Sequence, residues 1–465
     1  MDKKKILICI PSVWGVRNLI HSGLTKQFGE QYVLYYAVPT KGVTLLTSLG
    51  ISKANIVELP EVTFSGKYKL ISLLVSFSFI HKFPIKKNKI FKKVIRANAK
   101  NNFDYNTKIR PLKFLARLFT FKPAFNFIRK IETKLYLNEI PVGLKKELAT
   151  INPDLTISTT FVTGNEFLIT RYIQSLGKKT IAHVLSFDNI TSRGYYPLED
   201  FQHFMVWNDT MKNELIKYYG VKANNISITG TPQFDFHVRD EFKWDKQKLY
   251  SQIGLNINAP YFLYCANHLT LTPNEPELVE QIIDTCFNDD GLKHYQWVIR
   301  PHPLDDYKRW NNTVSKYKHV FFSEPWDNSI NDESQFACPS IDEITLLSNS
   351  LIHSSVVLNI ASTISIDAAI CNKPVVCLGF HPNKTTIDYT TYEKFHYTHH
   401  YQPIIDTGSI SLVLTIDELV NELHTIVNTP AYKQTERQAL VNEYTVINKG
   451  HSAHIIANII KQQCP

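Results

Sequence analysis

Polar and charged side chains follow two apolar segments in the last third of the chain, and their types suit an anion. The apolar segment that ends in Arg300 runs directly into Pro-His302-Pro. A second apolar segment, 356–360, is followed by Ser362 and Thr363 at the point where a helix is expected to begin. An arginine fork, a histidine N–H and the N–H groups of a helix start all bind phosphate. The spacing therefore predicts a phosphate site without a glycine-rich loop.

Three further residues are candidates for the same site. Asn267 and His268 follow the apolar segment 261–264, and Asp367 lies one helical turn after Thr363. Asn267 and His268 could contact a bound ligand from the side of the sheet, and Asp367 could accept hydrogen bonds from ribose hydroxyls. An ordinary serine or threonine N-cap and a solvated helix position for Asp367 are equally simple interpretations of these residues.

Several familiar catalytic motifs are absent from the sequence. No GxGxxG follows the first apolar segment, and there is no GxxxxGK[ST] or GxSxG, so a standard dinucleotide site, a P-loop and a nucleophile elbow are not supported. The histidines at 396, 399 and 400 have no carboxylate or cysteine at metal spacing, which favours surface or loop histidines. We expect neither a metal nor a resident cofactor.

The elements that must position these residues follow from the hydrophobic pattern. Short apolar segments alternate with segments of helical period in both halves of the chain, which predicts an α/β protein with two Rossmann-like, doubly wound parallel sheets facing a cleft. The expected strands are 6–11, 32–38, 155–159, 180–185, 204–207, 226–229, 261–264, 297–300, 319–322, 350–353 or 356–360, and 374–379. In such sheets, ligands bind at the carboxyl ends of the strands.

The chain length and local composition give the expected domain bounds. A chain of 465 residues is too long for one ordinary core, and the charged segment 238–248 has poor periodicity and suggests a linker. We expect an N-terminal acceptor-side domain over 1–245 and a C-terminal nucleotide-donor domain over 255–440. The last segment, 441–465, is expected to pack back on the first domain.

Positive charge is concentrated in one segment. Residues 67–134 hold eighteen Lys or Arg and two acids, a local charge of +16, whereas the whole chain carries +9. Aromatic residues are interleaved with these charges, and we expect a basic helical insertion in the N-terminal domain. This mixture fits an anionic membrane surface, although a solvated basic face with inward aromatics would also produce it. Nucleic acid is not expected as a partner because no recognition motif accompanies the charge.

The longest apolar run, 70–80, is about half of what a bilayer span requires. An integral membrane protein is therefore not expected. The scattered, odd-numbered cysteines favour a reducing cytoplasm. Together these features predict a cytoplasmic protein that is peripheral at the inner face of the plasma membrane.

The order of motifs in the second half resembles a known superfamily. A strand with RxHP, followed by VVLNIxSTISIDAAxxxKPVV, is similar to the C-terminal half of GT-B glycosyltransferases. Within this superfamily it looks like bacterial capsule and cell-surface transferases of the sialyl-, Kdo- and CDP-glycerol types. The resemblance covers about residues 150–380 and implies that His302, Ser362, Thr363 and Arg300 hold the donor's phosphate.

The same resemblance extends to SFDNITSRG, where Asp188 and Asn189 follow an expected strand. A carboxylate there is where an inverting transferase places its general base, which takes the acceptor's proton. An Asx turn is the structural alternative. Asp235 is a second candidate base, for which a hinge or capping role fits better. The acidic-acidic-Gly motif of sialyltransferases is spelled by Asp-Asp-Gly at 289–291, but in the wrong domain, so we interpret it as a turn.

The loop after the first strand supplies two acceptor-side candidates. Trp14 offers a face for sugar stacking, and Arg17 offers a partner for an acidic group. Packing of the first helix would account for them equally well.

These features predict a metal-independent glycosyltransferase that moves a sugar from a nucleotide donor to a bacterial surface glycan or lipid-linked acceptor. The resemblance implies CMP, as in a CMP-linked ulosonic acid, as the favoured nucleotide, followed by CDP or UDP. The alternatives are a CDP-polyol phosphotransferase and a non-catalytic module that binds anionic glycan or lipid. A nucleotide-sugar 2-epimerase would share the fold, but we would expect it to have more carboxylates at the site.

Overall fold

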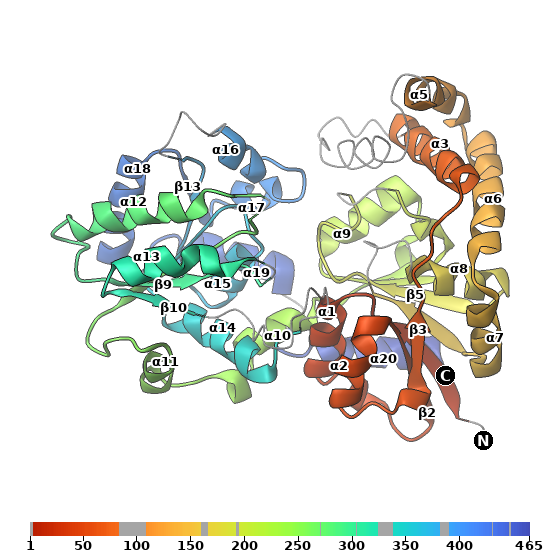
Figure 1. Ribbon diagram of the computed structural model, residues 1–465, viewed down its shortest axis with the longest axis horizontal. Coiled ribbons are helices and arrows are strands. Elements are labelled where there is room, and N and C mark those ends of the chain that lie inside the picture. The colour runs from red at the N-terminus through yellow and green to blue at the C-terminus, as the bar shows by residue number, and fades with distance from the viewer. Residues whose placement is uncertain are drawn as a thin grey trace. The chain divides into compact units, whose positions relative to one another are not determined.

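The chain forms two compact units, each with its own sheet and core. The computed structural model describes residues 3–82, 108–159, 166–191, 195–269, 271–303, 305–323, 338–381, 390–429, 431–445 and 448–465. The first unit comprises Met1–Thr231 and Ala453–Pro465, and the second comprises Pro232–Ser452 (Figure 1). Residues 232–245, assigned to the N-terminal domain from the sequence, thus belong to the second unit. The same holds for residues 441–452, so only 453–465 of the expected returning segment joins the first unit.

Within the described residues, the first unit contains a seven-stranded sheet in which every pairing is parallel. Its strands are β1 (Lys4–Cys9), β2 (Tyr32–Pro39), β3 (Ile56–Leu59), β4 (Leu155–Ser158), β5 (Lys179–His183), β6 (His203–Val206) and β7 (Ile226–Ile228). The order β3-β2-β1-β4-β5-β6-β7 reverses direction between β1 and β4, which is the switch point of a doubly wound sheet.

The helices of the first unit lie in sequence between these strands; the label η marks 3₁₀ and π segments. They are α1 (Val13–Gly15), η1 (Val16–His21), η2 (Thr25–Gln27), α2 (Thr40–Ser48), η3 (Lys53–Asn55), α3 (Gly66–Lys82), α5 (Arg110–Leu115), η5 (Ala116–Phe119), α6 (Lys122–Glu139), α7 (Val142–Ile151), α8 (Glu166–Ser175), η6 (Leu198–Asp200), α9 (Asp209–Glu214), η7 (Leu215–Tyr219), η8 (Ala223–Asn225) and α20 (Ser452–Gln463). Asn208 caps α9 by accepting a hydrogen bond from the Met211 N–H at 3.0 Å, as its residue type predicts.

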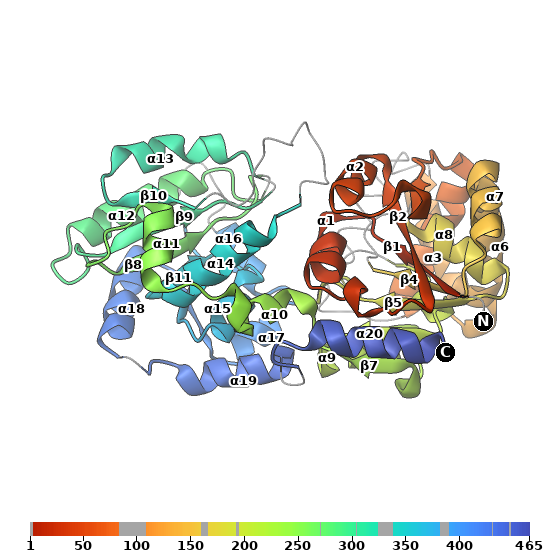
Figure 2. The same cartoon turned by 90° about the horizontal axis from the view of Figure 1, so that it is seen from below.

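The first core forms because its central strands are apolar on both faces. Ile6, Leu7 and Ile8 of β1 are completely buried, which is typical of a parallel strand covered by helices on both sides. The C-terminal helix α20 adds to this unit (Figure 2). The backbone oxygens at its end, at Gln463 and Cys464, accept hydrogen bonds from Lys179 (3.0 Å) and Tyr32 (3.3 Å).

The described part of the second unit contains a six-stranded parallel sheet. Its strands are β8 (Tyr261–Cys265), β9 (Gln296–Arg300), β10 (Val320–Phe322), β11 (Val356–Asn359), β12 (Val375–Leu378) and β13 (Ile410–Val413). The order is β10-β9-β8-β11-β12-β13, so the switch point lies between β8 and β11. Of the two strands left open by the sequence, 356–360 corresponds to β11, and 350–353 is helical.

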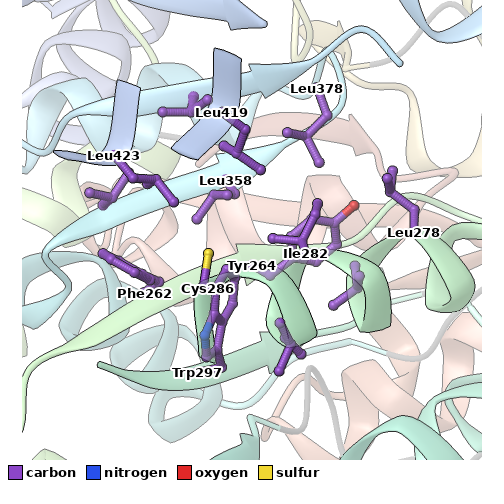
Figure 3. Close-up of a cluster of buried hydrophobic side chains, with 14 of the residues drawn as sticks. Phe262, Tyr264, Leu278, Ile282, Cys286, Trp297, Leu358, Leu378, Leu419 and Leu423 are labelled. Carbon is purple, nitrogen blue, oxygen red and sulfur yellow. The ribbon is translucent and has the colours of Figure 1, made fainter. Parts of the chain in front are cut away.

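Helices again connect the strands of the second unit. They are α10 (Pro232–Val238), η9 (Asp240–Phe242), α11 (Lys246–Ile253), α12 (Glu275–Phe287), η10 (Tyr307–Trp310), α13 (Asn311–Lys316), α14 (Ile341–His353), α15 (Ile364–Ile370), α16 (Thr390–His396), α17 (Gln402–Asp406), α18 (Ile416–Asn428) and α19 (Gln434–Thr445). Apolar residues of α12 and α18 pack on strand residues such as Phe262, Trp297 and Leu358 (Figure 3). This core holds β8, β9 and β11 in place, and the loops after these strands carry the predicted phosphate-binding residues.

Candidate functional site

The carboxyl ends of β9, β8 and β11 bring the predicted donor-side residues to one edge of the second sheet. These strands are direct neighbours, so the loops that follow them meet. The rings of His268, after β8, and His302, after β9, lie 5.7 Å apart between centroids in an edge-to-face arrangement. The Asn267 side-chain amide donates to the Ile360 carbonyl oxygen at 2.6 Å, which ties the β8 loop to the β11 loop across the switch point. Sequence spacing alone grouped these residues, and their strands do lie side by side.

Arg300 supplies a buried positive charge at this edge. Its side chain ends β9, is 5% exposed, and donates from Nη1 to the Ser323 hydroxyl at 3.0 Å. Burial lowers the pKa of Arg300 to about 10, so the guanidinium remains protonated at neutral pH. A cation with little water around it attracts an anion more strongly than a solvated one does.

His302 contributes a neutral imidazole. Burial, followed by the nearby His268, lowers its pKa to about 4. At neutral pH the ring therefore carries one N–H that can donate and one nitrogen that can accept. The backbone carbonyl of His302 accepts from the Asp305 N–H at 2.9 Å.

The Ser-Thr pair lies where α15 begins, as predicted, but Ser362 is already engaged locally. The preceding residue, Ala361, has φ +46°, a left-handed conformation that is strained for a residue with a Cβ. The Ser362 N–H donates to Asn359 Oδ1 at 3.1 Å, and its hydroxyl accepts from the Ile364 N–H at 3.4 Å. Thr363 is exposed and makes no capping bond with its side chain. Of the pair, Thr363 has the hydroxyl that is better placed for a ligand.

Asp367 lies in α15, and one of its oxygens is bonded within the protein. Its Oδ1 is 2.7 Å from Nε2 of His237 in α10, and His237 Nδ1 is 3.2 Å from the Ser348 hydroxyl. Burial opposes a charge on His237, but the Cys371 and Asp367 side chains outweigh it and raise its pKa to about 10. The proposed ribose contact of Asp367 stays a prediction. The sequence did not indicate His237, which is 130 residues away along the chain.

A buried carboxylate that sequence reasoning missed organises the β8 loop. Glu275, the first residue of α12, is completely buried. It accepts from the Tyr264 hydroxyl at 2.8 Å, from the Thr272 hydroxyl at 2.6 Å and from the Asn267 N–H at 3.1 Å. Burial raises the pKa of Glu275 to about 7, against the opposing effect of these donors and of Arg309.

Arg309 joins this loop to the loop after β9. Its guanidinium donates to Glu275 at 3.2 Å, to Asp305 at 2.8 Å and to the backbone oxygen of Asn267 at 3.0 Å. Asp305 in turn accepts from the Leu269 N–H at 2.9 Å. Both histidine-bearing loops are thus held by one buried ionic network.

In the first unit, Asp188 and Asn189 form a turn after β5. Asp188 Oδ1 accepts from the Ser186 hydroxyl at 2.5 Å, and the Asn189 N–H donates to the Ser186 carbonyl oxygen at 3.1 Å. Asp188 is half-buried and Asn189 is buried. Asp188 therefore takes part in a local turn, and its role as a base is not tested by this geometry.

The other acceptor-side candidates also have local contacts. The Arg17 guanidinium lies 4.9 Å from the ring centroid of Trp14, so the two side chains stack on each other.

Two acidic candidates lie in the second unit. Asp235, in α10, is buried and accepts from the Ser452 N–H at 3.3 Å, which suits the hinge or capping role. Asp289 accepts from the Gly291 N–H at 2.9 Å, so the Asp-Asp-Gly segment is a turn, as predicted.

No group of three His, Cys, Asp or Glu side chains in the described ranges is arranged to hold a metal ion. The expectation of a surface or loop position was wrong for His396. This residue ends α16, is completely buried and bonds through Nδ1 to the Tyr392 carbonyl oxygen at 2.9 Å.

No family model matches the chain, and no curated protein matches it. Solved structures do match along almost all of its length. They include UDP-GlcNAc 2-epimerase from Neisseria meningitidis bound to UDP-GlcNAc (TM-score 0.55, 11% identity, 98% of this chain and 100% of that one). UDP-GlcNAc 2-epimerase from Methanocaldococcus jannaschii also matches (TM-score 0.54, 12% identity, 99% of this chain and 99% of that one). So does UDP-N-acetylglucosamine 2-epimerase from Rickettsia bellii (TM-score 0.53, 12% identity, 99% of this chain and 97% of that one). At such low identity the likeness concerns the fold. Two parallel-sheet α/β units matching these proteins give the chain the GT-B fold, as the sequence predicted.

Proposed function

We propose that the protein is a glycosyltransferase that binds the phosphate of a nucleotide-sugar donor at the β9–β8–β11 edge. The observation that supports this most directly is that the His268 and His302 rings meet at the ends of the neighbouring strands β8 and β9, and that buried Arg300 is the last residue of β9. Ligands of doubly wound sheets bind at such an edge, next to the switch point.

The chemistry of this edge suits a departing phosphate. Arg300 would offset the negative charge that grows on the leaving nucleotide, and His302 would donate a hydrogen bond to it. Both groups are held in advance by the protein, so little reorganisation is needed as charge develops. Asp188 remains our candidate for the base that takes the acceptor's proton.

The finer assignment rests on the motif resemblance. We favour a CMP-linked donor such as a CMP-ulosonic acid, then CDP or UDP. The acceptor would be a bacterial surface glycan or a lipid-linked chain, and the enzyme would lie at the inner face of the plasma membrane. A CDP-polyol donor would use the same phosphate-binding groups.

A nucleotide-sugar 2-epimerase is the second candidate, favoured by a likeness to 2-epimerase structures that spans 98–99% of the chain. The disposition of carboxylates argues against it. Near the second-unit edge, Glu275 and Asp305 are bonded to Arg309, and Asp367 is bonded to His237. Moving a proton at a sugar carbon needs a carboxylate or another base that can reach it.

The test is thermal unfolding in the presence of CMP, CDP, UDP, GDP and dTDP compounds. A ligand at about 100 times its Kd stabilises the folded state by about 2.7 kcal/mol, which gives a clear rise in Tm. We expect one nucleotide class to raise Tm, and Arg300→Gln to abolish the rise. Arg117→Gln, an exposed arginine of the first unit, is the matched control. No response to any of these compounds would contradict the proposal.

Product analysis separates the two enzyme classes. Incubation of the protein with the stabilising nucleotide sugar alone should leave its sugar stereochemistry unchanged, as monitored by proton NMR. Appearance of the 2-epimer without any acceptor would replace the transferase with the epimerase.

A further inference from the structure

The helical surface of the first unit formed by α5, η5 and the first half of α6 exposes large apolar side chains. We call residues 110–131 the α5–α6 face. Phe114 is 69% exposed, Leu118 63%, Phe121 60% and Phe127 61%. Exposed large apolar side chains that lie this close together in the chain are typical of a segment that contacts a partner or a membrane.

These exposed residues do not lie on the side of the helices that faces the core. A separate set, Leu112, Ala116, Phe125 and Ile128, is buried. That set faces inward where α3 and η5 pack and where α3 runs along α6 (Figure 1). The helices are therefore apolar on the core side and again on part of the outer side. The alternative that the aromatics of the basic segment pack inward holds for Phe79 and Phe125, but not for the three exposed phenylalanines.

The charges on this face have one sign. Between residues 108 and 131 the sequence contains seven Lys or Arg and no Asp or Glu. Arg129 is held by Glu199 at 2.9 Å and Asp200 at 2.5 Å, which offsets its charge. The basic residues exposed to solvent are Lys108, Arg110, Arg117, Lys122 and Lys130. The expected basic segment also includes residues 83–107, which lie outside the described residues.

We propose that the α5–α6 face docks on an anionic lipid bilayer, with Phe114, Leu118 and Phe121 entering the headgroup region. Such a bilayer has an apolar acyl region beneath negatively charged headgroups, so it matches exposed apolar residues that are flanked by lysine and arginine. A second copy of the chain fits less well, because a two-fold dimer through this face would oppose like charges. This inference deepens the membrane location in the proposed function and does not depend on the donor.

Co-sedimentation of the full-length protein with lipid vesicles tests the proposal without any nucleotide. We expect binding to vesicles of phosphatidylcholine mixed with phosphatidylglycerol, and little binding to phosphatidylcholine alone. Each charge removed by Arg110→Gln, Arg117→Gln or Lys122→Gln should weaken binding by about fivefold. Phe114→Ser with Phe121→Ser should weaken it by at least about tenfold, because two inserted rings are lost. Higher salt should also release the protein, since the attraction of the charges is screened.

Matched controls come from exposed residues elsewhere in the first unit. Leu176 is 50% exposed, and Lys217 and Lys222 are exposed, so Leu176→Ser and the two Lys→Gln variants should bind vesicles like the unchanged protein. Absence of binding to the anionic vesicles would overturn the proposal, as would equal binding by the face variants. Concentration-dependent dimers that Phe114→Ser abolishes, with no vesicle binding, would assign the face to self-association instead. Because nucleotide stabilisation is measured separately, this test can fail while the proposed function holds.

Discussion

Burial lowers the pKa of both Arg300 and His302, but it leaves them in different charge states. The pKa of Arg300 falls to about 10 and that of His302 to about 4. Near neutral pH the edge therefore holds one permanent cation and one neutral imidazole. A phosphate bound between them would favour the protonated imidazole, because an opposite charge nearby stabilises the charged form.

This difference predicts that nucleotide binding takes up a proton at His302. The pKa of His302 should be higher in the complex than its value of about 4 in the free protein. Affinity should then rise as pH falls from the pKa of the complex toward that of the free protein, by up to about tenfold per pH unit. Calorimetric titrations in buffers of different ionisation enthalpy measure the uptake directly.

His302→Gln should remove this proton uptake, whereas His294→Gln, an exposed histidine of the same unit, should retain it. The nucleotide's own phosphate takes up or releases the same protons with both variants. The difference in proton uptake between the two variants is therefore due to His302. Equal uptake by the two variants would contradict the assignment.

At the scale of elements, the two histidine-bearing loops depend on the ion network below them. Glu275 and Arg309 connect the start of α12 with the β8 loop and with the loop after β9. Removing the Glu275 carboxylate would take the acceptor from the Tyr264 and Thr272 hydroxyls and one of two carboxylate partners from Arg309, and breaking such a buried network commonly costs about 3 kcal/mol. The network therefore bears on both stability and the placement of His268 and His302.

Glu275→Gln should lower the free energy of unfolding by about 3 kcal/mol and also weaken nucleotide binding. In the variant, the N–H groups of the new amide would face the Tyr264 and Thr272 hydroxyls, which donate to the carboxylate in the unchanged protein. Urea unfolding measures the first effect, and titration with the stabilising nucleotide measures the second. Glu277→Gln, on the exposed side of the same helix, is the control and should change neither. A Glu275→Gln protein of unchanged stability would show that the network is not required.

The elements also show which features could be predicted from sequence. Apolar segments bounded by polar residues correctly located β1, β9 and β11, because strands buried on both faces are apolar throughout. The edge strands β3 and β13 were not predicted, because each mixes polar with apolar residues (IVEL and ISLV) and does not stand out as an apolar run. Between β1 and β2 the chain forms the short segments η1 and η2, with Gly23 at φ +79° between them.

Pairings between distant residues explain the rest of what was missed. The sequence predicted that Arg300, His302 and Ser362 lie at one edge of the sheet, because the spacing of the motifs places each of them at the end of a strand. The bond of Asp367 to His237 joins residues 130 apart, and that of Arg309 to Glu275 joins residues 34 apart. Such contacts depend on how helices pack, and one sequence contains no direct sign of them.

At the scale of the whole molecule, the chain passes between the units twice. It leaves the first unit after Thr231 and returns at Ala453. The returning helix α20 buries Ile456, Ala457 and Ile460, so the first core is completed by the last residues of the sequence. None of the described helices is long and apolar enough to cross a bilayer.

This organisation predicts that the two cores respond separately to heat. Truncating the fully buried Ile456 to alanine should cost about 2–4 kcal/mol through lost burial and the cavity left behind, and only the first unit should be weakened. A bound nucleotide should instead raise the transition of the second unit, where its phosphate site is proposed. Differential scanning calorimetry of Ile456→Ala, with and without the stabilising nucleotide, should show one transition lowered by the substitution and another raised by the ligand. Ile455→Ala, at a half-buried neighbouring position, should have a smaller effect. A single transition that moves with both changes would contradict this prediction, because it would mean that the two units unfold together.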